Sequence, residues 1–191
     1  MLNDDERWVL SYYRTSELGG ALFFGRLARI LRPGPIQVDM TKHFADESAH
    51  AFWWTECLER LDSAPIRVTD AYQDRYLEAI GLPVNLMEIL AVTHVFERRA
   101  IGQYARHARS TDVQPEIRAT LERILRDERW HLEWVSNALR GLEGEYGTEE
   151  VRSTLRRFEA ADREVYETTI REHGERVAHL LGKPTRTEER S

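Results

Sequence analysis

The feature that most constrains the fold of this chain is an internal repeat that carries charged residues along with apolar ones. A shift of 80 positions places Glu17 on Glu97. A shift of 81 positions places residues 46–50 on residues 127–131, and both segments read Asp-Glu-x-x-His. The repeat also keeps bulky residues, with Trp53 and Leu58 in the first half falling on Trp134 and Leu139 in the second. The chain is therefore predicted to contain two similar halves.

Apolar residues recur at spacings of three and four between sparse Pro and Gly breaks, which is the period of an α-helix. Asn3 followed by Glu6 is typical of a capping box, and Pro115 suits a first helical turn. No alternating strand pattern of useful length occurs, so the predicted fold class is all-α. The pattern predicts long helices over 3–31, 37–61, 85–109, 115–142 and 148–181, and a short helix over 68–80.

The connections between these segments predict the topology. The first and second long helices, and likewise the third and fourth, are joined by short segments and should form antiparallel hairpins. The connection from the second to the third helix spans roughly 20 residues, enough to cross the length of a bundle. We therefore expect a four-helix bundle with one long crossover, followed by a long C-terminal fifth helix. Residues 1–182 are predicted to form one domain, and residues 183–191 a polar tail.

On each of the four bundle helices, an acid takes a seam position that the core would normally fill with an apolar residue. Four carboxylates buried without compensation would cost many kcal/mol or force their own protonation. Two divalent cations would balance these charges. The four seams run through Leu10, Glu17, Phe24 and Leu31; Met40, Glu47 and Trp54; Leu90, Glu97 and Tyr104; and Leu121, Glu128 and Val135.

Two of these acids belong to Glu-x-x-His motifs, in which both side chains lie on one helix face, one turn apart. One such motif occurs readily by chance in a Glu-rich chain, but the order Glu, Glu-x-x-His, Glu, Glu-x-x-His on four separate helices is far more specific. Carboxylate and imidazole donors suit iron or manganese. The sequence predicts a dimetal site made by Glu17, Glu47, His50, Glu97, Glu128 and His131.

Over residues 1 to about 143, this ordered ligand set resembles the ferritin-like diiron carboxylate superfamily, which includes bacterioferritin, rubrerythrin and diiron oxidases. The resemblance implies two iron ions, or manganese at one or both positions. It implies that Glu47 and Glu128 bridge the metals, that Glu17 and His50 terminate one ion, and that Glu97 and His131 terminate the other. It further implies hydrogen bonds from His131 to Asp46 and from His50 to Asp127 that orient the imidazoles.

Several functions are compatible with such a site. The first is a diiron oxidoreductase that activates dioxygen or peroxide to oxidise a small organic substrate. The second is a ferroxidase, or a rubrerythrin-like protein that reduces peroxide without an organic substrate. The third is hydroxylation of a modified tRNA base, supported only by the run of Arg98, Arg99, Arg106 and Arg109. The net charge of −6 argues against nucleic acid.

Other residues near the predicted ligands have open roles. His43 and His94, each about one turn from a predicted ligand, are either extra ligands, proton donors or ordinary packing residues. Gly19 and Gly20 either leave room beside the metals or allow close helix packing. An oxygenase would need a substrate cavity, and its expected lining is Tyr13, Gly20, Phe24, Trp54, Ile101 and Tyr104.

The remaining expectations concern location and partners. Cys57 is the single cysteine, so the chain cannot build a thiolate cluster of its own, and we expect an external electron donor. No apolar run reaches the roughly 20 residues of a membrane span. The acidic N-terminal residues do not resemble a signal peptide, and the cytoplasm is the expected compartment. The long fifth helix either covers the bundle or pairs with a second subunit in a homodimer.

Overall fold

The computed structural model describes residues 2–69 and 72–181, and the predicted tail at 183–191 lies outside the described residues. The described part of the chain is all-α, as predicted, and contains no strand. Its helices are α1 (Asp4–Ile30), α2 (Pro35–Arg60), α3 (Tyr72–Ile80), α4 (Leu86–Arg109), α5 (Pro115–Gly141), α6 (Glu143–Tyr146) and α7 (Thr148–Leu181).

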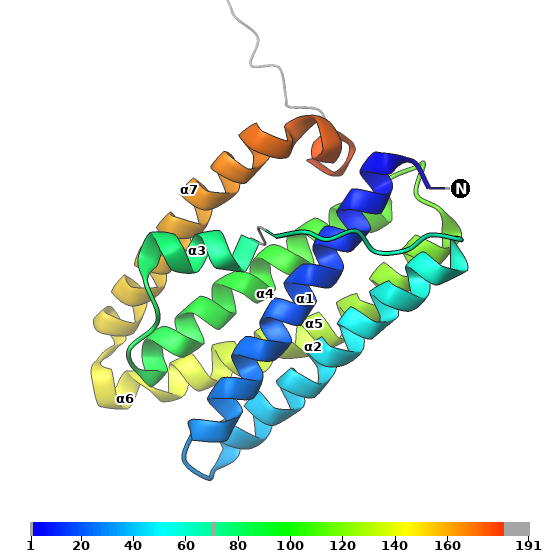
Figure 1. Ribbon diagram of the computed structural model, residues 1–191. Coiled ribbons are helices and arrows are strands. Elements are labelled where there is room, and N and C mark those ends of the chain that lie inside the picture. Colours follow the sequence, from blue (N-terminus) through cyan, green and yellow to red (C-terminus); the bar gives the residue numbers. More distant parts are fainter. Residues whose placement is uncertain (1, 70–71, 182–191) are drawn as a thin grey trace, which may run out of the picture.

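The helices α1, α2, α4 and α5 form the predicted four-helix bundle (Figure 1). Short turns join α1 to α2 and α4 to α5, so each pair is an antiparallel hairpin. The connection from α2 returns along the bundle through α3, and α4 consequently runs parallel to α2. This crossover brings the two copies of the repeat face to face.

The helices begin at the signals that the sequence contains. The Asn3 side chain accepts a hydrogen bond from the Glu6 backbone N–H at 2.8 Å, and the Glu6 side chain accepts one from the Asn3 N–H at 3.0 Å. Pro115 occupies the first turn of α5. Helix α2 begins at Pro35, two residues before the predicted start at Gln37, because proline fits a first turn whose N–H groups have no helical partner.

The bundle core consists of two apolar clusters, each of which packs residues from both hairpins. The first contains Leu10, Trp54, Leu58, Leu121 and Ile124, all essentially inaccessible to solvent. The second contains Phe24, Met40, Leu90, Val135 and Leu139. On α1, α2 and α5 the buried acid lies between the two clusters in sequence, and on α4 apolar cluster residues stand on both sides of Glu97. Apolar packing on both sides therefore holds the helices together around a polar centre.

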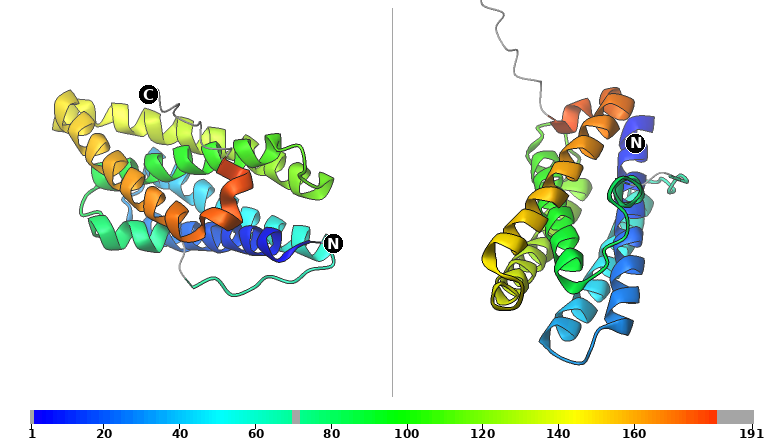
Figure 2. Two further views of the ribbon diagram at one scale, coloured as in Figure 1. Left: turned by 90° about the horizontal axis from the view of Figure 1, so that it is seen from above. Right: turned by 90° about the vertical axis from the view of Figure 1, so that its left-hand side faces the viewer.

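Helix α7 packs along α4, and α3 packs against α7 and α1 (Figure 2). Asp162 of α7 accepts a hydrogen bond from the Tyr72 hydroxyl of α3 and forms an ion pair with Arg99 of α4. The Tyr76 hydroxyl donates to the Phe158 carbonyl at 2.9 Å. The long C-terminal helix thus covers the bundle, which was one of its two expected roles. No helix in the described ranges combines the length and apolarity that a membrane span requires.

Candidate metal centre

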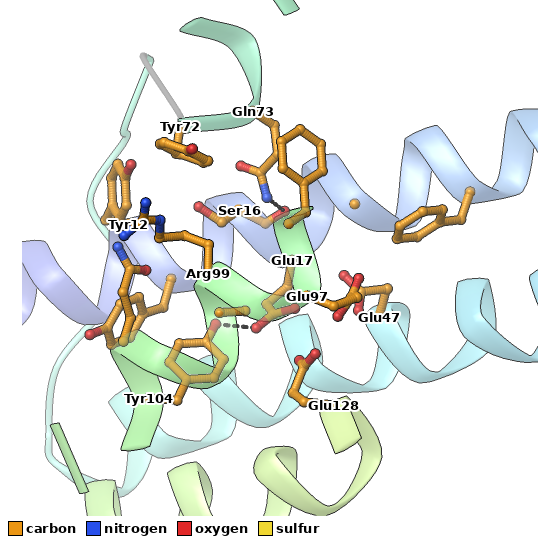
Figure 3. Close-up of a pocket in the computed structure, with 16 residues that line it drawn as sticks. Tyr12, Ser16, Glu17, Glu47, Tyr72, Gln73, Glu97, Arg99, Tyr104 and Glu128 are labelled. Carbon is orange, nitrogen blue, oxygen red and sulfur yellow. Dashed lines mark hydrogen bonds between the residues drawn. The ribbon is translucent and has the colours of Figure 1, made fainter. Parts of the chain in front are cut away.

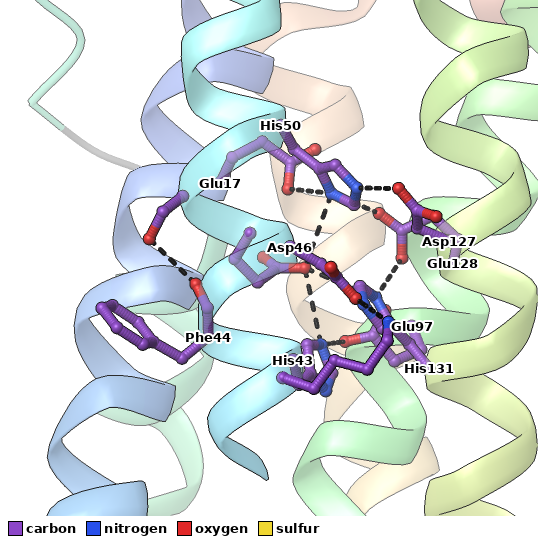
Figure 4. Close-up of polar contacts among 12 residues, drawn as sticks. Glu17, His43, Phe44, Asp46, His50, Glu97, Asp127, Glu128 and His131 are labelled. Atoms are coloured by element: carbon purple, nitrogen blue, oxygen red, sulfur yellow. Dashed lines mark hydrogen bonds and ion pairs between the residues drawn. The ribbon is translucent and has the colours of Figure 1, made fainter. Parts of the chain in front are cut away.

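The structure brings all six predicted ligands together in the middle of the bundle (Figure 4). Helix α1 supplies one glutamate, α4 supplies another, and α2 and α5 each supply a glutamate and a histidine one turn later. Every one of these residues is at least 95% buried: Glu17, Glu47, His50, Glu97, Glu128 and His131.

The first imidazole faces three carboxylates from three different helices. The Nδ1 atom of His50 lies 3.3 Å from Glu128 Oε1, 3.6 Å from Glu17 Oε2 and 3.8 Å from Glu47 Oε1. This Nδ1 atom is buried and has no hydrogen-bond partner among the residues that the structure describes. A buried nitrogen aimed at several carboxylate oxygens is the arrangement that a metal ion between them would require.

The second imidazole repeats this geometry. The Nδ1 atom of His131 lies 3.3 Å from Glu128 Oε2, 3.5 Å from Glu97 Oε2 and 3.6 Å from Glu47 Oε1. Glu47 and Glu128 therefore contact both imidazoles, whereas Glu97 lies beside only this one. The central and peripheral placement of the glutamates matches the bridging and terminal roles that the resemblance implies.

The donor atoms form two overlapping sets. Glu17, Glu47, His50 and Glu128 have ligand atoms within 4.8 Å of one another, and so do His43, Glu47, Glu97 and His131. Each set offers oxygen and imidazole nitrogen, which suits iron or manganese. The residues present therefore fit two divalent cations that share the central carboxylates.

The outer nitrogens of both histidines face aspartates across the bundle. His50 Nε2 lies 3.3 Å from Asp127 Oδ2, and His131 Nε2 lies 3.2 Å from Asp46 Oδ2. These are the two pairs that the resemblance implies, each joining one hairpin to the other. A carboxylate accepts a hydrogen bond from an N–H group. Each pair therefore favours hydrogen on Nε2 and leaves the Nδ1 lone pair for a metal.

Burial and charge crowding shift the proton affinities of the carboxyl groups. Burial raises the pKa of Glu47 well above its ordinary value, and the charges of the other three glutamates add to this effect. Burial and the nearby Glu128 raise the pKa of Glu97 in the same way. For Glu128, hydrogen bonds from His131 and His50 outweigh burial and hold its pKa well below the ordinary value.

The pKa values of the His50 and His131 imidazoles are shifted in the direction that favours the charged ring. Burial alone would lower the pKa of His131, but hydrogen bonds to Asp46, Glu128 and Glu97 outweigh burial and raise it to about 12. The pKa of His50 is also raised, because its bonds to neighbouring carboxylates outweigh burial. Without metal, the site therefore favours protons on both imidazoles and on Glu47 and Glu97.

His43 is a further group at this centre, one whose role the sequence leaves open. It is fully buried, and its Nε2 atom lies 3.1 Å from Glu97 Oε1 and 3.5 Å from Glu47 Oε1. Its Nδ1 atom accepts a hydrogen bond from Trp134 Nε1 at 3.3 Å. Burial lowers the pKa of His43 well below its ordinary value, which favours a neutral ring. His94, by contrast, lies 3.3 Å from Ser136 Oγ and belongs to neither donor set.

Tyr104 also contacts the centre, although the sequence places it only on a cavity wall. Its hydroxyl donates to Glu17 Oε1, and its pKa is raised well above the ordinary value by burial and by the Glu17 charge. The seam position of Tyr104, one heptad after Glu97, indicates that it faces the core. Which glutamate it reaches depends on the opposing helix, which the heptad pattern does not specify.

A small cavity lies beside the carboxylates (Figure 3). Its volume is about 50 Å³ and its walls include all four glutamates of the site. Among the expected lining residues, Tyr13, Gly20, Phe24 and Tyr104 line this cavity, whereas Trp54 and Ile101 do not. In the described part of the chain, no histidine lines it, so the cavity meets the carboxylate side of the centre.

Gly20 lines the cavity and also makes room for the Glu47 carboxylate. A Cβ atom at Gly20 would clash with the Glu47 carboxylate, whereas one at Gly19 would have no atom within 4 Å. The two glycines therefore differ in purpose. Gly20 is required by the close approach of Glu47, and Gly19 is not.

Comparison with known families matches residues 9–139 to the model of the Rubrerythrin family. A comparison with curated proteins gives no match. The matched segment contains all six predicted ligands and both aspartates, and it ends before α6 and α7.

Proposed function

The chain belongs to the rubrerythrin family of ferritin-like diiron proteins, and from that premise we propose that its buried centre reduces hydrogen peroxide to water. The balanced reaction joins one peroxide with two electrons and two protons, breaks the O–O bond and gives two waters. A pair of ferrous ions held by the six ligands would supply the two electrons, one from each ion.

The size of the cavity beside the carboxylates is the observation that supports this proposal. Its volume of about 50 Å³ is far below the roughly 300–1,000 Å³ of pockets that hold drug-sized ligands. One water needs about 10–15 Å³ of such space, so the cavity holds only a few water-sized molecules and suits peroxide or dioxygen.

The surrounding residues would prepare the centre for this reaction. Hydrogen bonds from the imidazole Nε2–H groups to Asp46 and Asp127 orient the two rings, and the hydroxyl of Tyr104 holds Glu17. The apolar clusters on both sides exclude bulk water, which strengthens these interactions. Electrons would come from a separate donor, because the single cysteine, Cys57, is buried and cannot form a thiolate iron site alone.

Oxygen activation for a small organic substrate is the second candidate. Aromatic side chains, including Tyr12, Tyr13 and Phe96, form much of the cavity wall, and such walls would accept an apolar molecule if the cavity widened. Hydroxylation of a modified tRNA base has less support, because Arg98 pairs with Glu159 at 2.6 Å and Arg99 pairs with Asp162. Two of the four arginines are thereby neutralised within the protein.

Anaerobic loading with Fe(II) followed by rapid mixing tests the proposal. We expect hydrogen peroxide to oxidise the loaded protein faster than dissolved dioxygen does, with one peroxide consumed for each pair of ferrous ions. A reductant added afterwards should restore the ferrous state and permit further turnover. Dioxygen uptake that depends on an organic compound would favour the second candidate. Steady oxidation of Fe(II) well beyond two ions per chain would indicate a ferroxidase instead.

A further inference from the structure

The two terminal glutamates of the centre lie against different residues. Glu17 accepts from the Tyr104 hydroxyl. Under the 80-residue shift of the repeat, Tyr104 corresponds to Phe24, which has no hydroxyl. Glu97 therefore lacks the phenolic donor that the symmetry of the two halves would provide.

His43 lies where that donor is missing. Its ring packs on Phe24 with centroids 4.0 Å apart, and its Nε2 atom reaches Glu97 Oε1 at 3.1 Å. Under the 81-residue shift, His43 corresponds to Ile124, which is apolar. The two halves thus differ in a compensating way, because the half that lacks a hydroxyl at Phe24 gains an imidazole at His43.

The neighbouring tryptophan determines which nitrogen of His43 carries hydrogen. An indole N–H only donates, so the 3.3 Å contact from Trp134 Nε1 requires a bare Nδ1 on His43. A neutral imidazole has one N–H, and here it must lie on Nε2, facing Glu97. His50 and His131 have the opposite arrangement, because their Nε2 atoms face aspartates and their Nδ1 atoms face the carboxylates.

We propose that His43 is a positioning residue rather than a third imidazole ligand. Its Nε2–H, fixed by Trp134, faces the Glu97 carboxylate and would donate to it when a metal is held beside His131. Its stacking on the His131 ring, with centroids 3.7 Å apart, fixes the ring further. The two metal positions then have one imidazole each but differ in the group that orients the terminal glutamate. The inference rests on the dimetal site and not on peroxide chemistry.

Nitrogen NMR of protein labelled with ¹⁵N-histidine, with and without Zn(II), tests this assignment directly. We expect His43 to show a bare Nδ1 and a protonated Nε2 in both states. In the zinc-loaded protein, only the Nδ1 atoms of His50 and His131 should become metal-bound. A metal-bound Nε2 on His43 would overturn the proposal. If Zn(II) fails to bind, the metal-free spectrum still tests it, because a protonated Nδ1 on His43 would contradict the assignment.

Two tryptophan variants separate the hydrogen bond from general packing. Trp134→Phe keeps an aromatic ring but removes the indole N–H, so His43 should redistribute between its two tautomers. Trp53→Phe changes the corresponding residue of the first half, whose ring lies 5.2 Å from His50, and should leave the His43 tautomer unchanged. An unchanged tautomer in Trp134→Phe would mean that Trp134 does not fix the ring.

Substitutions of His43 itself test the link to Glu97. His43→Leu removes the donor while keeping an apolar side chain, and should weaken binding of one of two Zn(II) ions by roughly 10- to 100-fold. His43→Gln restores an N–H donor and should recover part of this loss. Equal loss in both variants, with folded protein by circular dichroism, would indicate a ligand instead. Both titrations are independent of peroxide, so they remain informative if the proposed reaction fails.

Discussion

The hairpins α1–α2 and α4–α5 have the same ligands but different surroundings. Each supplies two glutamates, one histidine and one aspartate at matching positions. The residues around these ligands do not match: Gly20 corresponds to Ala100, Phe24 to Tyr104, and His43 to Ile124. The repeat therefore determines which atoms meet, whereas the unmatched neighbours make the two metal positions different. The following predictions test how far that difference extends, beginning with the largest effect.

Removing a central glutamate should abolish the metal pair. Glu47 and Glu128 each lie beside both imidazoles, so Glu47→Ala or Glu128→Ala removes a carboxylate that both positions share. We expect loss of the magnetically coupled pair in Mössbauer spectra of ⁵⁷Fe-loaded protein. Glu17→Ala, the matched control, should leave one ion at the position beside His131. An intact coupled pair in Glu47→Ala would show that this residue does not bridge.

The glycine pair gives the sharpest steric contrast. Gly20→Ala places a methyl group against the Glu47 carboxylate and should lower metal affinity by roughly 10- to 100-fold. Gly19→Ala meets nothing and should leave metal binding unchanged while stabilising α1 by up to about 1 kcal/mol. Metal titration and thermal melting of both variants measure these effects. Normal binding in Gly20→Ala would mean that Glu47 can move away without loss.

The aspartates should act across the bundle rather than within their own hairpin. Asp127→Asn keeps the side-chain size but removes the charge that faces His50, so affinity at the His50 position should fall by roughly tenfold. Asp46→Asn should instead weaken the His131 position. Stepwise Zn(II) titration followed by histidine NMR identifies the affected ring. Loss confined to the histidine of the same hairpin would contradict the cross-bundle pairing.

The metal-free protein should lose stability as pH rises. His131 has a folded pKa of about 12, so its contribution is fully present below its unfolded pKa near 6.5 and is lost as pH rises toward 12. The pKa values of Glu47 and Glu97 are also raised, so their contributions to stability are likewise lost as pH rises, from about pH 4.5 upward. Glu128 has the opposite sign, losing its contribution at lower pH.

Metal loading must displace these protons, so affinity should rise with pH by about 1.4 kcal/mol per pH unit for each proton released. Melting of metal-free and Zn(II)-loaded protein from pH 6 to 9 measures both effects. We expect the gap between the two melting temperatures to widen with pH. A constant gap would show that the free ligands hold no extra protons.

The fold and the grouping of the six predicted ligands were accessible from sequence because each depends on a local pattern. The helical period, the capping box at Asn3 and the first-turn proline at Pro115 indicate the helices, and the membership in a ferritin-like family confirms the bundle. The two Glu-x-x-His motifs lie on seams where only a charge-balancing role is physically reasonable. Repeated acids at matching positions indicate a shared metal site even when the tertiary contacts are unknown.

The groups around the ligands were less accessible because they depend on how helices face one another. Trp54 was expected on the cavity wall, but it packs in the apolar cluster with Leu58. Helical spacing places His43 and His94 similarly, yet only His43 reaches the centre. Rotations of a few tens of degrees separate these outcomes, and a seam pattern does not resolve them.

The smallest predicted effect comes from making the first half resemble the second. Phe24→Tyr adds a hydroxyl to a fully buried ring that packs on His43, and this crowding should cost roughly 1–2 kcal/mol of unfolding free energy. His43→Ile removes the ring and leaves Glu97 without its donor. In the double variant, the new hydroxyl has space and can donate to Glu97, as Tyr104 donates to Glu17.

The double variant should therefore be more stable than the sum of the single changes predicts, by roughly 1 kcal/mol. Trp134 loses its acceptor in both variants that lack His43, so this loss cancels from the coupling energy. Urea unfolding of the four metal-free proteins at one pH measures the coupling. Strict additivity would mean that a hydroxyl at position 24 does not replace the His43 imidazole as the donor to Glu97. The compensation between the two halves would then be coincidental.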